Sequence, residues 1–146
     1  MPDYTPPFIN RTLSLTASAA VTGGQVVEVS GNGTIQPCAT AGSVKAIGVA
    51  LHDSPVNGRV TVTAFGPVHE TPVATAATVT AGDQIQTGSA PAGSVQTAPP
   101  SSTPATEPAV YAAASTVADI STARSIIGVA LTTATAPAKV RWVQCL

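Results

Sequence analysis

The sequence contains one apolar phrase twice, and this repeat limits the folds that the chain can adopt. Ile47–Leu51 and Ile127–Leu131 both read I-G-V-A-L. Similar stretches precede them: Val21–Val29 and Val79–Thr87 each begin V-T-x-G, continue with one polar residue and then enter an alternating run. A basic residue and a last alternating run follow each phrase. Because the order is the same in both halves, the sequence indicates a duplicated β-unit.

Alternation with a period of two, tight-turn glycines and short apolar runs predict strands in both units. In the first unit the predicted strands are Thr12–Thr16, Gln25–Ser30, Thr34–Cys38, Val44–Leu51 and Arg59–Phe65. The second unit is expected to repeat them from Val79, with a hairpin tip at residues 88–93 and a last strand at Lys139–Val143. Val68–Thr78 is expected to be a connector with a short strand around Val73.

The phrase I-G-V-A-L is expected to be the central strand of each half. The nearly continuous apolar run Val44–Leu51 is typical of a strand that is covered on both faces. A glycine inside such a strand marks the close approach of another backbone or a bulky side chain. Gly48 and Gly128 are therefore expected to allow close packing where the two halves meet.

The second unit carries extra residues between Thr97 and Ser125. The part at residues 98–109 is rich in Pro, Ser and Thr and is predicted to be an exposed loop. Ser115–Ala123 is predicted to be at most one short helix. The expected fold is all-β: a compact barrel or sandwich of two similar units, about 12–68 and 79–146, within a single domain at 12–146.

Residues 1–11 are expected to form an extended N-terminal arm, because its prolines fix φ and remove amide donors. Aromatic and aliphatic side chains lie between those prolines, which suits an arm that lies on a neighbouring surface. The residues expected to make such contacts are Tyr4, Pro6, Pro7, Phe8, Ile9 and Arg11. The alternative, that Phe8 and Ile9 pack into the core of their own chain, stays open.

Charge is scarce in this chain. Its 146 residues carry a formal net charge of −1, and only 9% of them are charged. A near-neutral surface favours association and gives no electrostatic reason to expect a nucleic-acid partner. No apolar run approaches the roughly 20 residues that span a bilayer, so no membrane partner is expected. The N-terminus lacks the pattern of a signal peptide.

Few residues offer chemistry. His52–Ser54 places three triad residue types side by side, but real triads are assembled from distant positions, so a capped polar loop is expected instead. His69–Glu70 has no second ligand at a metal-like spacing, and Cys38 and Cys145 lack zinc-type spacing. The two thiols are expected to be buried and free, with a disulfide possible. Trp142 is expected to be a core anchor rather than an interface residue. No catalytic residue, cofactor or metal is predicted.

The repeated phrases resemble those of the capsid decoration (head fibre-like, head-stabilising) proteins of tailed bacteriophages. The residues that carry the resemblance are Gly48–Leu51, Gly128–Leu131 and Ala81–Ile85, within a similarity from about Leu13 to Val143. The resemblance implies a non-enzymatic cement protein, commonly a homotrimer, that binds the major capsid protein at three-fold and quasi-three-fold positions. It places the chain on the outer capsid surface of the virion, after synthesis in the host cytoplasm.

Two other functions remain open. One is a different virion module, such as a head fibre or a tail subunit. The other is a carbohydrate-binding β-module, which the absence of a signal peptide pattern and the single Trp disfavour.

Overall fold

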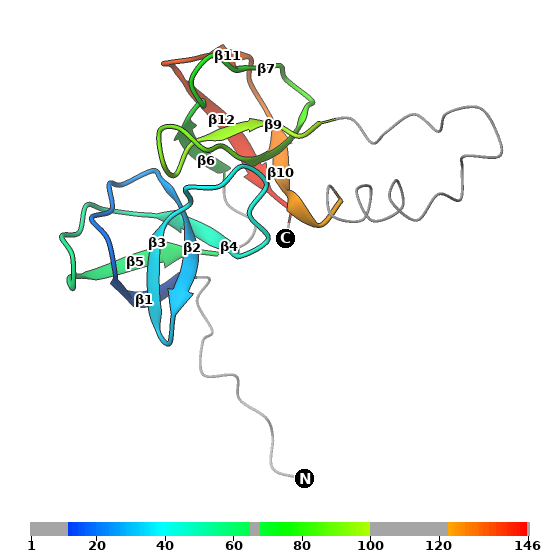
Figure 1. The fold of residues 1–146 in the computed structure, drawn as a ribbon. Coiled ribbons are helices and arrows are strands. Elements are labelled where there is room, and N and C mark those ends of the chain that lie inside the picture. Colours follow the sequence, from blue (N-terminus) through cyan, green and yellow to red (C-terminus); the bar gives the residue numbers. More distant parts are fainter. Residues whose placement is uncertain (1–11, 65–67, 100–122, 146) are drawn as a thin grey trace, which may run out of the picture.

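The computed structural model describes residues 12–64, 68–99 and 123–145, which form two β-structures lying side by side (Figure 1). The fold is mostly β, as predicted. The strands are β1 (Thr12–Ala17), β2 (Val26–Gly31), β3 (Thr34–Pro37), β4 (Ala46–Ala50), β5 (Arg59–Thr63), β6 (Val68–Pro72), β7 (Thr78–Val79), β8 (Gln84–Thr87), β9 (Val95–Thr97), β10 (Ile126–Ala130), β11 (Ala134–Thr135) and β12 (Lys139–Gln144).

The first half is a closed five-stranded barrel in the order β1-β3-β2-β4-β5. Four of its pairings are antiparallel, and the parallel pair β1–β3 closes it through Thr16↔Thr34 and Ala17↔Ile35. Along each strand, every second side chain points into the interior of the barrel. The cluster inside consists of Ala17, Val21, Val27, Ile35, Ala50, Val60 and Val62, with Leu15 and Ile47 packed against it.

Taken the other way round from β1, the barrel order is β1-β5-β4-β2-β3. The second half repeats it as β6-β12-β10-β8-β9. The antiparallel neighbours correspond one to one, so β6 occupies the place that β1 has in the barrel. In place of the parallel pair β1–β3 there is a single parallel bridge, Val73↔Val95. The two-stranded sheet β7–β11 likewise matches the isolated bridge Val21↔Ser54. The duplication predicted from the sequence is therefore present in the strand topology.

The turn before β2 and the turn before β8 are built in the same way. The Gln25 side chain accepts a hydrogen bond from the Thr22 amide at 2.8 Å, and the Asp83 carboxylate accepts one from the Thr80 amide at 2.9 Å. Gly24 and Gly82 take positive φ values of 90° and 93°, which suit glycine. A polar side chain that caps its own turn is thus the physical reason for the shared V-T-x-G phrase.

Gly48 and Gly128 do leave room for close neighbours, but the neighbours belong to the same half. A Cβ on Gly48 would lie closer than 3.0 Å to the Thr63 carbonyl, and one on Gly128 equally close to the Val143 carbonyl. Both carbonyls belong to the adjacent strand of the same sheet. The close approach is therefore between paired strands of one sheet rather than, as expected, between the halves, although Gly48 also lines the space where the halves meet.

The two halves are joined by a shared core and by backbone hydrogen bonds. The Val26 amide donates to the Gly93 carbonyl at 2.9 Å, and the Gly93 amide donates to the Cys38 carbonyl at 2.7 Å. The shared core lies around the outer face of the barrel and the inner face of the second sheet. It comprises Val26, Cys38, Val49, Val73, Val79, Ile85, Val95, Ile127, Ala130, Ala134, Val140 and Trp142.

Several predictions about single elements need correction. The connector does hold a short strand, but it is β6 at Val68–Pro72, and Val73 makes only an isolated bridge to Val95. The run Val44–Leu51 is not covered throughout, since Val44 and Leu51 at its ends are exposed. Residues 123–125 are helical, while the remainder of the predicted helix, the N-terminal arm and residues 100–109 of the predicted loop lie outside the described residues. No helix in the described ranges is long and apolar enough to span a membrane.

Candidate functional site

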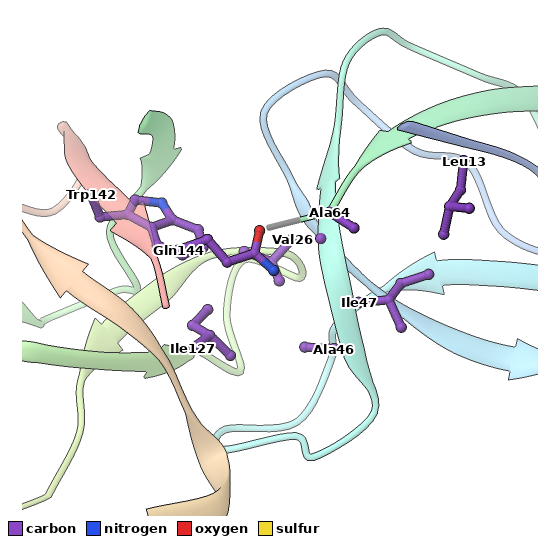
Figure 2. A pocket seen from close by; sticks show the side chains of 9 residues that line it. Leu13, Val26, Ala46, Ile47, Ala64, Ile127, Trp142 and Gln144 are labelled. Carbon is purple, nitrogen blue, oxygen red and sulfur yellow. The ribbon is translucent and has the colours of Figure 1, made fainter. Parts of the chain in front are cut away.

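An apolar cavity of about 180 Å³ lies where the end of the barrel meets the second sheet (Figure 2). Barrel residues form one side of it and residues of β10 and β12 form the other. Its lining consists of Leu13, Val26, Ala46, Ile47, Gly48, Ala64, Ile127, Trp142 and Gln144. Strand register explains the grouping, because β1 begins, β5 ends and β4 begins at this end of the barrel.

Trp142 is fixed firmly in the wall of this cavity. Its indole Nε1 donates a hydrogen bond to Thr71 Oγ1 at 3.0 Å, and the side chain is 1% exposed. The ring of His69 packs against it with centroids 5.0 Å apart. Trp142 is thus a core anchor, as predicted. The indole N–H and the Thr71 hydroxyl thus satisfy each other by a hydrogen bond, so the wall is held rigidly.

His69 supports the same wall from β6. Its Nε2 lies 3.2 Å from Gln144 Oε1, and Gln144 extends into the space between the two halves in Figure 2. Burial lowers the pKa of His69 below its usual 6.5, while the contact with Gln144 opposes that shift. A neutral imidazole is therefore the form that suits this buried position.

A second, open hollow continues the cavity along the outside of the barrel. It is lined by Val29, Ser30, Gly31, Val44, Lys45, Ala46 and Ile47. Ala46 and Ile47 line both hollows, so the two adjoin each other. Val29 is 43% exposed and Val44 is 65% exposed. Two large aliphatic side chains are thus exposed beside the apolar cavity.

The His52–Ser54 loop is structural, as expected. The Asp53 carboxylate accepts a hydrogen bond from the Gly23 amide at 2.8 Å. Ser54 Oγ donates to the Arg59 carbonyl at 3.2 Å, whereas His52 Nε2 accepts from the Thr61 amide at 3.1 Å. The three side chains have separate partners, so they do not form the relay of a triad.

The cysteines differ from each other. Both are free thiols, but Cys38 is buried and Cys145 is exposed, which corrects the prediction that both are buried. Burial, with a smaller contribution from the Glu28 carboxylate, raises the pKa of Cys38 to about 12. Such a thiol stays protonated near neutral pH and is a poor nucleophile. Glu28 itself accepts hydrogen bonds from Gln36 and Ser43.

The arrangement offers apolar contact rather than acid–base or metal chemistry. Within residues 12–64, 68–99 and 123–145, no group of three or more His, Cys, Asp or Glu side chains could hold a metal ion. His69 packs against Trp142 and lies 3.2 Å from Gln144 Oε1, and neither partner is ionisable. The site can therefore receive an apolar side chain in a preformed hollow.

The six arm residues predicted to contact a partner lie outside the described residues, so the geometry of the site does not include them. The hollows themselves are a feature that the sequence did not predict. One signal was available: Val44, the first residue of the central apolar run, directly follows the turn Ala41–Ser43 and precedes the charged Lys45. A large aliphatic residue in that setting is a candidate for exposure.

Comparisons with known proteins give a fold likeness. No protein-family model matches the chain, and no curated protein sequence matches it. Among solved structures, the chain resembles the head fiber gp8.5 N base in bacteriophage phi29, with a TM-score of 0.59 and 15% sequence identity. The likeness covers 92% of this chain and 92% of that one. The fold of the whole chain, rather than of one half, is thus shared with that structure.

Proposed function

We propose that this chain is a structural protein of a bacteriophage virion. On this proposal it is a capsid decoration, or cement, protein that binds the outer surface of the mature head and stabilises the shell. The observation that carries the proposal is the likeness to the phi29 head fiber N base over 92% of both chains. The proposal includes no catalytic activity and no cofactor.

The physical properties of the chain suit such a role. A formal net charge of −1 lets many copies lie close together without strong mutual repulsion. The two halves share one core, which makes a stiff support for attachment. We propose a homotrimer at three-fold and quasi-three-fold positions, because several linked contacts make weak individual contacts to the major capsid protein sufficient.

The N-terminal arm belongs to this proposal as a second attachment to the capsid. Its proposed contact residues are Tyr4, Pro6, Pro7, Phe8, Ile9 and Arg11. An extended segment can add to the sheet edge of a partner through backbone hydrogen bonds alone. Deletion of residues 1–9 is expected to leave folding intact and to weaken head binding. Unchanged affinity would show that the arm does not attach the protein.

The test of the whole proposal is binding to heads of the phage that encodes the chain. Purified protein is incubated with expanded heads and with unexpanded proheads, and bound protein is measured after sedimentation. We expect saturable binding to expanded heads and better retention of their DNA on heating. The absence of binding to expanded heads would rule the cement function out.

A second candidate function is the base of a head fibre. It is favoured by one observation: the matched structure is the N base of a head fiber, and the likeness covers 92% of that chain. A fibre base carries a further distal structure, whereas a cement protein acts alone. Labelling the protein in virions and locating the label by electron microscopy separates the two, because only a fibre base lies beneath a projecting rod.

A further inference from the structure

The two adjoining hollows share Ala46 and Ile47 and lie at the end of the barrel where β1 begins, and we treat them together as one apolar groove. We call it the mouth groove and define it by Leu13, Val29, Val44, Ala46, Ile47 and Trp142. We propose that the mouth groove is the capsid-facing surface of the protein. It receives an aliphatic or aromatic side chain from an extended segment of the major capsid protein, next to an acidic residue of that segment. This inference rests on the proposed function and names the part of the chain that performs it.

The place where the arm joins the barrel points to this end. The first described residue is Thr12, and the next residue, Leu13, lines the groove. Residues 1–11 therefore join the described chain one residue before Leu13, which lines the groove. Fully extended, eleven residues reach at most roughly 40 Å. A capsid segment in the groove and a capsid surface under the arm would then form one continuous interface.

The groove fits one large apolar side chain. Apolar cavities of about 150 Å³ in proteins stay dry and take up benzene, so a cavity of about 180 Å³ has space for a ring of that size. The wall residues Trp142 and Thr71 hold each other by a hydrogen bond of 3.0 Å, which keeps the hollow open before binding. A preformed pocket costs less ordering on association than one that must be made.

The rim adds a charge preference. Lys45 is the charged residue among the described residues that line the two hollows, and it is exposed. Val44, its neighbour in the chain, is the most exposed of the large apolar side chains that the structure describes, at 65%. A partner segment with an apolar side chain beside a carboxylate would bury Val44 and pair with Lys45. An ion pair at the rim of an interface mainly fixes the position of the partner segment along the groove and raises the association rate.

The opposite end of the barrel supplies a matched control. The register Thr12↔Thr63 and Thr16↔Arg59 shows that β5 begins far from the groove and ends beside it. Val56, which precedes β5, therefore lies at the far end, and it is 53% exposed. Val44→Asp and Val56→Asp introduce the same charge at similarly exposed valines, at opposite ends of one barrel.

The experiment measures sedimentation binding of the full chain and these two variants to expanded heads. Circular dichroism and sedimentation velocity first check that each variant keeps its fold and its oligomeric state. We expect Val44→Asp to weaken binding at least tenfold and Val56→Asp to bind like the wild type. Lys45→Glu is expected to slow association, and less so at high salt.

Each other outcome overturns the inference. Equal binding by the Val44→Asp variant and the wild type would mean that the groove does not face the capsid. Equal losses in both variants would mean that added charge alone weakens binding. A changed oligomeric state for Val44→Asp would assign the groove to contacts between copies of this chain. If the wild type binds no heads, the proposed function fails instead, which the wild-type measurement alone reveals.

Discussion

Replacing Gly48 by Ala tests the explanation of why the phrase I-G-V-A-L occurs twice. The added Cβ would lie closer than 3.0 Å to the Thr63 carbonyl and 2.9 Å from Cγ1 of Val62. The carbonyl belongs to the neighbouring strand β5, which is held in the closed barrel on both sides. Relief therefore requires a shift of paired backbone rather than a change of side-chain rotamer.

The magnitude follows from the kind of atom in the way. Overpacking in a well-packed core costs typically about 1–3 kcal/mol, and more when backbone must move. We expect Gly48→Ala to lower the free energy of unfolding by about 3 kcal/mol. For a chain of this size that corresponds to a melting temperature lower by roughly 10 °C. Gly128→Ala is expected to behave alike, because its Cβ would meet the Val143 carbonyl and the Trp142 ring.

Urea unfolding and calorimetry measure the effect, and Gly31→Ala is the control. Gly31 also lies in a strand, but its Cβ would meet only the side-chain hydroxyl of Thr34, at 2.8 Å. That hydroxyl can rotate away, so the control is expected to change stability by less than about 1 kcal/mol. If Gly48→Ala is as mild as Gly31→Ala, the glycines are not required by strand packing and the argument for their duplication fails.

Three further predictions concern buried side chains. Cys38 has a pKa raised to about 12, so a thiol reagent at pH 8 is expected to label only Cys145 in the folded protein and both cysteines in urea. Because the unfolded thiol ionises first, stability is expected to fall as the pH rises from about 9 towards 12, and Cys38→Ala should remove that slope. Burial lowers the pKa of His69, so the unfolded state binds its proton first; stability is expected to fall below pH 6.5, less steeply in His69→Gln. Trp142→Phe loses the hydrogen bond to Thr71 and leaves that hydroxyl unpaired, and urea unfolding is expected to show a cost of about 2–3 kcal/mol.

The strands of the barrel could be predicted from the sequence because their environment is simple. In β5, Val60 and Val62 face the interior and are fully buried, while Thr61 and Thr63 face outward. Hydrophobic alternation reports such a strand directly. The glycines of Gly31-Asn32-Gly33 likewise predict the hairpin after β2. In the structure Gly33 takes a φ of 71°, which few other residues adopt.

The position of strand β6 could not be predicted, because its polar and apolar residues do not follow the usual pattern of a half-buried strand. Its buried face carries His69 and Thr71, which are 6% and 0% exposed, while Val68 on the same strand is 50% exposed. The usual alternation is therefore reversed: polar side chains point into the core, and an apolar side chain points to solvent. Polar side chains are tolerated inside because Trp142 and Gln144 supply their hydrogen-bond partners from β12. Those partners are over 70 residues away in sequence, so no local pattern could reveal them.

The mouth groove escaped prediction because it depends on how the halves are joined. Leu13, Ile127 and Trp142 come from distant parts of the chain and line one cavity only when the second sheet meets the end of the barrel. Each residue alone suits an ordinary strand. The duplication explains the similar strand order of the halves, and the shared core fixes one half against the other. The apolar cavity of the groove is lined by residues of both halves and exists only in the joined pair, which gives a reason for two copies in one chain.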